Sequence, residues 1–274
     1  MLIRKNNVIV PEKILNGLQT DFMGQKIHYF TKVASTNDIA KKFAVKGAKE
    51  GTVIIAETQS RGKGRFGRRW ASPKGGIYFS IILRPKVSPQ DALKLTFMAA
   101  VAVAKAIKKM FILSAEVKWP NDVLINGKKV CGILTEMSTR DDVVDFVVVG
   151  IGINANVNVD LFPEDLRSAV TSLKEEMAEE VDLELFLRVL LEELEHYYMV
   201  FMRREFDIIL KEWRSLTKLL GAYVEVVSFD EKFEGLAIDV DSSGALIVKL
   251  RDGTLKKVVS GDVTYRSNEQ SFSY

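Results

Sequence analysis

The sequence of 274 residues contains a single cysteine, Cys131, and only two histidines, His28 and His196. Zinc sites are built from clusters of Cys and His side chains, and Cys–His nucleophilic pairs need both residue types close together. The composition therefore argues against both kinds of site. One cysteine also excludes an internal disulfide framework, which suits a protein of the reducing cytoplasm. Chemistry in this chain is expected to depend on fixed charges and positioning rather than on a protein nucleophile.

Long hydrophobic runs are missing as well. A membrane span needs an apolar run of about 18 residues, and the chain has none. The first residues, MLIRKNNVIVPEK, lack the apolar stretch of a signal peptide. The net charge of +3 is too small to mark the whole chain as a nucleic-acid binder. We therefore expect a cytoplasmic globular protein that binds neither a membrane nor DNA.

The most distinctive segment is 59–70, QSRGKGRFGRRW, which has five basic residues, three glycines and no carboxylate. Glycine allows backbone N–H groups to approach a ligand closely, and arginine and lysine supply fixed positive charge. The segment therefore predicts a loop that wraps an anion, in the first place a phosphate. A nucleic-acid-binding loop and a solvated surface turn remain as alternatives.

Neither of the two common phosphate-binding patterns fits this segment. The pattern G-x-x-x-x-G-K-[ST] is absent. The glycine spacing G-x-G-x-x-G is present, but Pro73, Gly75 and Gly76 follow it and cannot open a helix. Short apolar runs at 53–56 and 77–83 flank the segment and predict buried strands. The basic loop is thus expected at the rim of a sheet, where ligand sites concentrate.

The remaining pattern predicts an α+β protein. Helices are expected from Ser35 to Gly47, where Ser35 and Asp38 have the form of a capping box, from Ser88 to Met110, and over 182–213. Strands are expected at 115–119, 123–125, 130–134 and 143–149, with a hairpin turn at Asn126-Gly127. After Gly221, short alternating strands predict a small antiparallel β-barrel. We therefore expect one domain over 1–220 and a second over 221–274.

Three motifs in this order, QSRGKGRFGRRW, KWPNDVLINGKKVCGILTE and VVGIGINAN, resemble the biotin–protein ligases over residues 27 to 265. The resemblance implies a catalytic domain with a mixed sheet similar to class II aminoacyl-tRNA synthetases, followed by an SH3-like β-barrel. Some members carry an additional DNA-binding domain at the N-terminus. This chain has no room for one, so it is expected to be similar to the monofunctional class.

The resemblance also implies functional residues. It places biotin recognition on Ser35, Thr36, Asn37 and Gln59, and the biotin and adenylate loop on Gly62, Lys63, Gly64, Arg65 and Arg68. Lys118 corresponds to the lysine that contacts both biotin and the α-phosphate, and with Arg65 and Arg68 it is the expected catalytic set. Trp70, Asn121 and Asn154 correspond to positions of the nucleotide site. The family often has arginine at the position of Lys63 and a further basic residue at the position of Phe66. Lysine keeps the charge but loses the planar fork of donors.

The activity implied by the resemblance has two steps. Biotin reacts with ATP to give biotinyl-5′-AMP, and a lysine of a biotin carboxyl carrier protein then takes the biotin. Biotin, ATP and Mg²⁺ are the expected small-molecule components, with no metal held by the protein itself. The resemblance leaves a homodimer open. A ligase for lipoate and a nucleic-acid module are the rival readings, and the polar set at Ser35 to Asn37 argues against the apolar dithiolane of lipoate.

Overall fold

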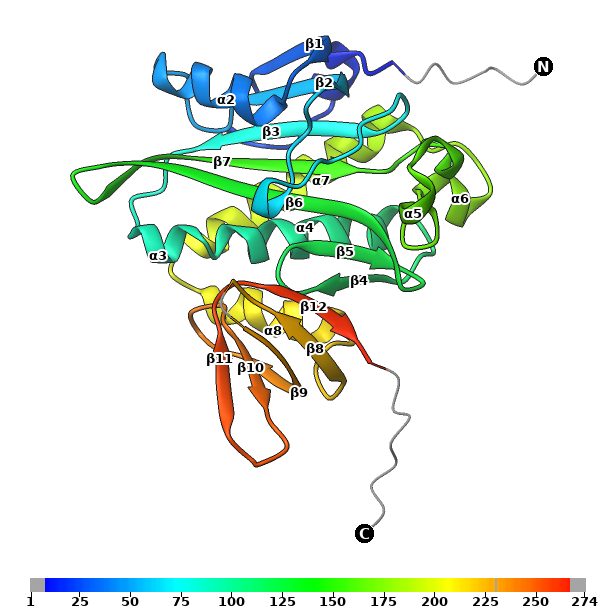
Figure 1. Ribbon diagram of the computed structural model, residues 1–274. Helices are drawn as coiled ribbons and strands as arrows, with labels where there is room; N and C mark the ends of the chain where they lie inside the picture. Colours follow the sequence, from blue (N-terminus) through cyan, green and yellow to red (C-terminus); the bar gives the residue numbers. More distant parts are fainter. Residues whose placement is uncertain (1–7, 230, 267–274) are drawn as a thin grey trace.

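The computed structural model describes residues 8–229 and 231–266. The larger part of the chain is built around a seven-stranded mixed sheet with the strand order β1-β2-β3-β7-β6-β5-β4 (Figure 1). Only β1 and β2 are parallel to each other, and the other neighbours in this sheet are antiparallel. The strands are β1 (Ile27–Val33), β2 (Val53–Gln59), β3 (Ile77–Leu83), β4 (Ala115–Lys118), β5 (Asp122–Ile125), β6 (Lys128–Arg140) and β7 (Val143–Ile153). A mixed sheet with helices confirms the predicted α+β class.

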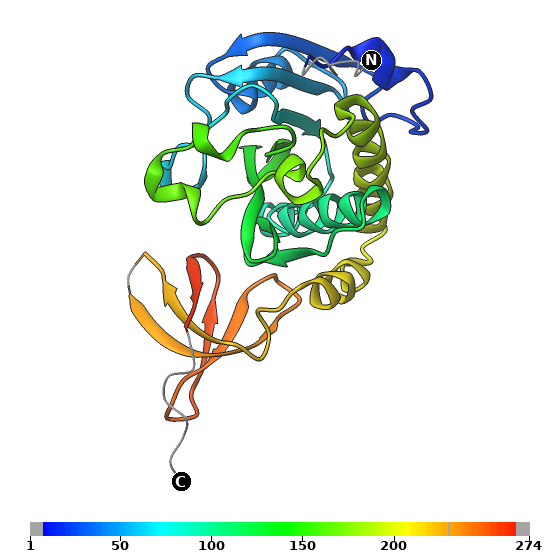
Figure 2. The same cartoon turned by 90° about the vertical axis from the view of Figure 1, so that its right-hand side faces the viewer.

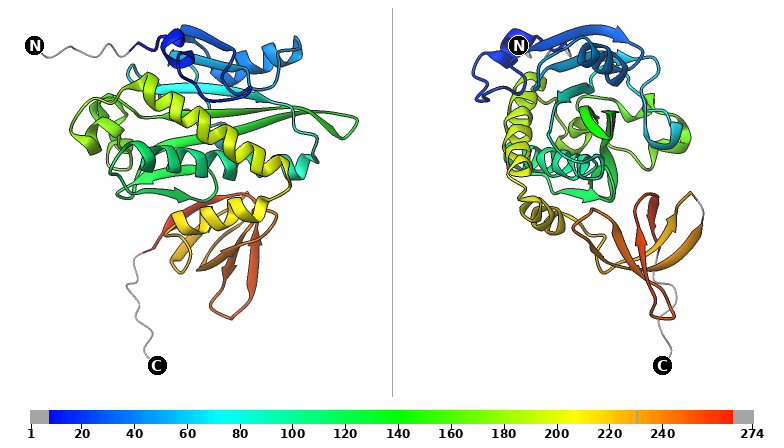
Figure 3. Two further views of the ribbon diagram at one scale, coloured as in Figure 1. Left: turned by 180° about the vertical axis from the view of Figure 1, so that it is seen from behind. Right: turned by 90° about the vertical axis from the view of Figure 1, so that its left-hand side faces the viewer.

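Two long helices cover one face of this sheet. Helix α4 (Leu95–Met110) packs on β4, β5, β6 and β7, and α7 (Leu183–Met202) packs on α4 (Figure 3). The apolar positions that predicted a helix in α7 are buried: Leu183, Phe186, Leu187, Leu190 and Leu194. The predicted helix from Ser88 is divided in two, because α3 (Pro89–Ala92) ends before α4 begins at Leu95. No helix within the described residues is long and apolar enough to cross a membrane.

Helix α2 (Thr36–Val45) packs on the opposite face of the sheet. Its apolar side, with Ala40 and Ala44, forms a small second core with Ile54, Phe146 and Val148 of the sheet. The N-terminal end of α2 is left pointing toward the middle of β6 and β7. The smaller helices are α1 (Pro11–Leu15), α5 (Glu164–Arg167), α6 (Leu173–Met177), and the 3-10 turns η1 (Arg65–Gly67) and η2 (Val159–Leu161).

Local turn chemistry fixes the hairpin between β5 and β6. Asn126 and Gly127 have φ values of 51° and 75°, which a two-residue hairpin turn of the mirror-image kind requires. The predicted turn at these two residues is therefore confirmed. The pairing places Gly132 of β6 opposite Gly152 of β7, and Leu134 opposite Gly150.

The C-terminal part is a five-stranded antiparallel sheet with the order β11-β10-β9-β8-β12 (Figure 2). It follows α8 (Phe206–Leu216) and contains β8 (Tyr223–Val227), β9 (Lys232–Val240), β10 (Leu246–Lys249), β11 (Leu255–Val258) and β12 (Asp262–Tyr265). The predicted barrel is not closed, because within residues 231–266 the edge strands β11 and β12 do not pair with each other. Both edge strands have four residues. The turn between them contacts Arg65 of the larger domain. The change from helix to strand falls between Leu216 and Tyr223, where the domain boundary is predicted.

A buried tryptophan joins the two sheets. Trp119 follows β4, is 2% exposed, and its Nε1 donates a hydrogen bond of 3.0 Å to the carbonyl of Gly244 in the turn between β9 and β10. Trp213 of α8 is equally buried, but its Nε1 has no partner among the described residues. The two tryptophans therefore differ in the hydrogen bond rather than in burial.

This difference allows a test of the hydrogen bond between Trp119 and Gly244. We expect Trp119→Phe to lower the free energy of unfolding more than Trp213→Phe does, by about 1–3 kcal/mol, because it also leaves a buried carbonyl without its donor. Urea unfolding of both variants measures the difference. Equal losses in the two variants would show that the bond to Gly244 contributes nothing.

Candidate functional site

A cavity of about 240 Å³ lies between the basic loop, the start of α2, the middle of β6 and β7, and the start of β12. It gathers residues from seven segments of the chain, which also include the start of β5 and residues between 162 and 170. The sequence-predicted residues that line it are Ser35, Thr36, Asn37, Gln59, Lys63, Gly64, Arg65, Arg68, Trp70, Asn121 and Asn154. Two predicted residues, Gly62 and Lys118, are not in its lining.

The basic loop is folded back on itself as a small hairpin. The N–H of Trp70 donates to the carbonyl of Gly62 at 2.9 Å, and the N–H of Gly64 donates to the carbonyl of Arg68 at 2.7 Å. A Cβ atom on Gly62 would lie 2.4 Å from the carbonyl oxygen of Trp70, so glycine is needed there for close backbone approach. Gly62 thus shapes the loop from behind the cavity.

Three glycines of the central strands form the floor of the cavity. A Cβ on Gly152 would lie 2.4 Å from Nε1 of Trp70, and one on Gly132 would lie 2.8 Å from the same indole. A Cβ on Gly150 would lie 2.0 Å from Oδ1 of Asn37. The absence of side chains at these positions lets Trp70 and Asn37 lie directly on the sheet. Nε1 of Trp70 is buried there without a partner among the described residues.

The start of α2 brings three small polar residues to one wall of the cavity. Ser35, Thr36 and Asn37 are each less than 5% exposed. Ser35 stands at the N-cap, but its side chain makes no capping bond, so the predicted capping box is wrong. The N–H of Thr36 instead donates to Oε1 of Gln59 at 2.8 Å, and Nε2 of Gln59 donates to Ser72 at 2.9 Å. A glutamine from a neighbouring strand therefore satisfies the helix end.

Among the described residues, each side-chain cation of the loop that lines the cavity has an oxygen partner, with the exception of Arg69. Lys63 forms an ion pair with Asp38. Nη2 of Arg68 lies 2.7 Å from both carboxylate oxygens of Asp262 in β12. Arg65 donates to Ser260 at 3.0 Å and to the carbonyl of Gly261 at 3.1 Å. Burial lowers the pKa of Arg65 from its usual value, and Asp262 opposes that shift. The ion pairs are half-exposed, so they are weak enough to exchange for a ligand anion.

The lysine on the cavity wall is Lys129 rather than Lys118. Nζ of Lys129 lies 2.7 Å from Oδ1 of Asp122 and 5.3 Å from the centre of the Trp70 ring. Lys118 is at the end of β4, and its Nζ lies 5.8 Å from the centre of the Tyr265 ring in the C-terminal sheet. Burial lowers the pKa of Lys118, with Asp122 opposing and Lys129 adding to the shift. Lys129 therefore lines the cavity, and Lys118 lies close enough to Asp122, Lys129 and Asp262 for their charges to act on its pKa, so its predicted role stays a prediction.

Two asparagines carry polar groups toward the cavity. Asn121 donates from Nδ2 to the carbonyl of Ile133 at 2.8 Å, which leaves its Oδ1 near Arg65. Asn154 is fully buried and donates from Nδ2 to the carbonyl of Thr171 at 3.0 Å. Its Oδ1 is buried and has no hydrogen-bond partner among the described residues. Asn154 thus offers an unused acceptor to a ligand that brings an N–H group.

Sequence reasoning missed several lining residues. Lys129 and Asp122 lie within the motif KWPNDVLINGKKVCGILTE, but a lysine after a hairpin turn is indistinguishable by pattern from a solvent-facing one. For Gly132 and Leu134, strand alternation is a signal, because residues two positions apart share one face of β6 and both line the cavity. Asp262 gave no local signal at all, because its role comes from a contact with Arg68, a residue 194 positions earlier. The other missed lining residues include Arg69, Gly150, Gly152, Phe162 and Leu166.

Comparison with known proteins identifies the family. Residues 29–154 match the family model described as the biotin/lipoate A/B protein ligase family, and residues 219–266 match the biotin protein ligase C-terminal domain. The bifunctional ligase/repressor BirA of Bacillus spizizenii is 38% identical over 263 residues, which cover 96% of this chain and 81% of that protein. The biotin–[acetyl-CoA-carboxylase] ligase of Paracoccus denitrificans is 34% identical, covering 78% of this chain and 90% of that protein.

A solved structure agrees with these matches. The biotin protein ligase from Aquifex aeolicus, in complex with biotin and ATP, superposes with a TM-score of 0.75 at 27% identity, covering 88% of this chain and 99% of that one. The fold and the cavity thus define a ligase of small carboxylic acids. The chain belongs to the biotin protein ligase family, as the resemblance of its motifs implies.

The glycine floor can be tested by substitution. We expect Gly152→Ala to lower the free energy of unfolding by about 1–3 kcal/mol, because the new methyl group overlaps the Trp70 indole. Most of this loss should disappear in a Trp70→Ala background. Denaturant unfolding of the two single variants and the double variant measures the coupling.

Gly150→Ala is the matched control, since its methyl group meets Asn37 and not Trp70. Its cost should be the same with or without the indole. If Trp70→Ala relieves both substitutions equally, or neither, the indole does not lie on Gly152 in solution.

Proposed function

We propose that this cavity activates biotin with ATP to biotinyl-5′-AMP and then transfers biotin to a lysine of a biotin carboxyl carrier protein. The observation that carries the proposal is the division of one cavity into two chemical halves. Neutral donors and acceptors gather at the start of α2 and at Gln59, and cations gather on the loop and at Lys129. The first half suits the uncharged ureido ring of biotin, and the second suits a carboxylate and phosphates.

In the first step, a carboxylate oxygen of biotin attacks the α-phosphorus of ATP. A new phosphorus–oxygen bond forms, and the bond to pyrophosphate breaks. Two anionic reactants must approach each other, so fixed positive charge lowers the barrier. We assign this role to Lys129, Arg65 and Arg68, with Lys63 at the edge. In each case the protein carboxylate or oxygen that holds the cation marks where an anion of the substrate would compete.

In the second step, the lysine amine of the carrier protein attacks the carbonyl carbon of the mixed anhydride. The amide forms, AMP leaves, and the amine loses a proton. Neither step needs a covalent bond to the enzyme, which agrees with the scarcity of Cys and His in the chain. The basic loop covers the cavity, and a covered anhydride is protected from hydrolysis by water.

We assign the nucleotide to the part of the cavity formed by Trp70, Asn121 and Asn154. The indole of Trp70 offers a flat apolar face for an adenine ring. The unpartnered Oδ1 of Asn154 is suited to accept a hydrogen bond from an exocyclic amino group such as that of adenine. Binding would then remove a buried unsatisfied acceptor, which is favourable by itself.

We propose that Mg²⁺ enters with the phosphates of ATP. Among residues 8–229 and 231–266, no group of three or more His, Cys, Asp or Glu side chains could hold a metal ion. Two carboxylates do line the cavity, Asp122 and Asp262. Mg²⁺ commonly binds through one or two carboxylates together with substrate phosphates. Asp122 and Asp262 therefore fit an ion that is carried by the substrate phosphates.

The finer expectations from the sequence remain proposals. The monofunctional class and the absence of DNA binding are not supported by the Bacillus relative, which is named a ligase/repressor. The carrier protein as acceptor agrees with the acetyl-CoA-carboxylase ligase of Paracoccus. A homodimer, a cytoplasmic location, the boundary near residue 220, and the likeness of the larger domain to class II synthetases stay predictions.

The activation step has a direct test. Purified protein should release pyrophosphate only when biotin, ATP and Mg²⁺ are all present, with no acceptor protein added. Lipoate is the critical comparison, because the family model covers lipoate ligases as well. Release with lipoate at the rate seen with biotin would overturn the biotin assignment.

The central cation has a second test. Lys129→Ala should slow pyrophosphate release by about a hundredfold, since loss of one positioned charge in a closed site commonly costs ~3 kcal/mol. Lys118→Ala is the comparison variant, because Lys118 is the cation predicted from sequence and the charges of Asp122, Lys129 and Asp262 act on its pKa. It should lose less activity than Lys129→Ala if Lys129 is the central cation. Single-turnover assays with both variants measure this. A larger loss in Lys118→Ala would assign the central role to Lys118, which stays a prediction from the sequence.

A further inference from the structure

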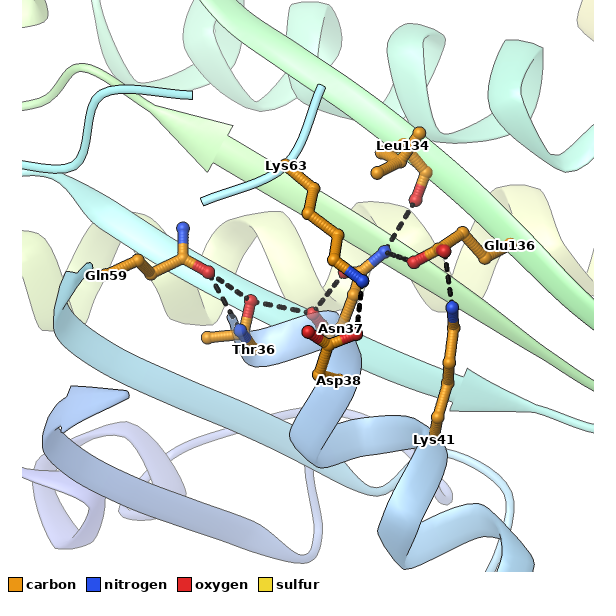
Figure 4. Close-up of polar contacts among 9 residues, drawn as sticks. Thr36, Asn37, Asp38, Lys41, Gln59, Lys63, Leu134 and Glu136 are labelled. Atoms are coloured by element: carbon orange, nitrogen blue, oxygen red, sulfur yellow. Dashed lines mark hydrogen bonds and ion pairs between the residues drawn. The ribbon is translucent and has the colours of Figure 1, made fainter. Parts of the chain in front are cut away.

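We propose that Glu136 is a positioning residue for biotin recognition, which acts by fixing the orientation of the Asn37 side-chain amide. The inference rests on the proposed function, because it concerns the half of the cavity assigned to the ureido ring. Glu136 itself is not in the lining of the cavity. Its carboxylate reaches the cavity wall only through Asn37 (Figure 4).

The alternation of strand β6 places Glu136 behind Asn37. Gly132 and Leu134 line the cavity, and Glu136 is the next residue on the same face, opposite Val148 of β7. Asn37 lies over Gly150, between the cavity and the carboxylate. The amide therefore has the ligand space on one side and a negative charge on the other.

The hydrogen bonds of Asn37 define one orientation of its amide. Nδ2 donates to Oε2 of Glu136 at 2.8 Å and to the carbonyl of Leu134 at 3.3 Å. Oδ1 accepts from the hydroxyl of Ser80 at 2.7 Å. An ionised carboxylate only accepts hydrogen bonds, so a rotated amide would place Oδ1 against Glu136 and be repelled. Asn37 is 4% exposed, and water cannot easily compensate for such a contact.

The orientation of this amide affects more than one residue of the wall. The Ser80 hydroxyl lies 2.7 Å from Oδ1 of Asn37 and 2.8 Å from Oγ1 of Thr36, and it has one proton to donate. Oγ1 of Thr36 in turn lies 3.1 Å from Oε1 of Gln59. If the amide turned over, Nδ2 of Asn37 would face Ser80. The hydroxyl proton of Ser80 would then be donated to Oγ1 of Thr36 instead of to Asn37. The pattern of donors and acceptors offered to the ureido ring would change with it.

Lys41 holds the other oxygen of the carboxylate. Its ammonium group forms an ion pair with Oε1 of Glu136, and the two side chains are 35% and 24% exposed. A pair this exposed contributes little to folding. It does hold the carboxylate of Glu136 so that its other oxygen is aimed at Asn37. The arrangement is therefore better suited to orienting the amide than to stabilising the fold.

The test replaces the acceptor by a neutral isostere that can also donate. In pyrophosphate release, Glu136→Gln should raise the KM for biotin about tenfold or more, because a mismatched buried polar contact has that effect on binding. The KM for ATP should stay unchanged, which a general structural defect would not produce. The matched control is Glu50→Gln, another half-buried glutamate, whose carboxylate accepts from the N–H of Arg84 at 2.7 Å far from the cavity.

A double variant separates positioning from direct contact. In an Asn37→Ala background, Glu136→Gln should cause no further rise in the KM for biotin. Additive effects, or a wild-type KM for biotin in the single Glu136→Gln variant, would overturn the inference, and the second outcome needs no Asn37 variant to fold. If the wild-type protein releases no pyrophosphate with biotin, the proposed function fails first, and this result is distinct from a failure of the role of Glu136.

Discussion

The placement of two side chains that line the cavity depends on three positions of the central strands that carry no side chain. In β6 and β7, Gly132, Gly150 and Gly152 share one face, and the space above them is filled by the indole of Trp70 and the amide of Asn37. Any side chain at these positions would overlap one of these groups. The flanking residues of β7 remain large and buried on the other face, so the sheet keeps its core under α4. One strand pair therefore serves as both the core of the domain and the floor of the site.

The cations around this floor form ion pairs with carboxylates of the protein. Lys129, Arg68 and Lys63 each face a carboxylate of the protein: Asp122, Asp262 and Asp38. Such partners keep long side chains near the cavity and limit repulsion between like charges. Because the pairs are partly exposed, a substrate phosphate or carboxylate can replace them at small cost. The opposite wall, from Ser35 to Asn37 with Gln59, contains no charge and is fixed by hydrogen bonds instead.

The C-terminal sheet belongs to the site in this arrangement. Ser260, Gly261 and Asp262 hold the two arginines of the loop, Trp119 donates to Gly244, and Lys118 faces the ring of Tyr265. The edge strands β11 and β12 do not pair with each other within the described residues. The turn that connects them contacts Arg65. The C-terminal sheet is therefore open at its edges and still contacts the larger domain. The basic loop is bonded to both parts of the chain.

The sequence by itself determined what depends on neighbouring residues. Glycine and charge spacing predicted a basic loop, Asn126-Gly127 specified the hairpin between β5 and β6, and the motifs specified the family, because each of these signals is local. The tertiary structure decided which charged groups meet. Lys118 and Lys129 are equivalent by pattern, and only strand pairing places Lys129 on the cavity wall. Asp262 and Glu136 gave no signal, since their partners lie 194 and 99 residues away along the chain. Contacts at such separations are fixed by packing of the whole fold, and no local pattern encodes them.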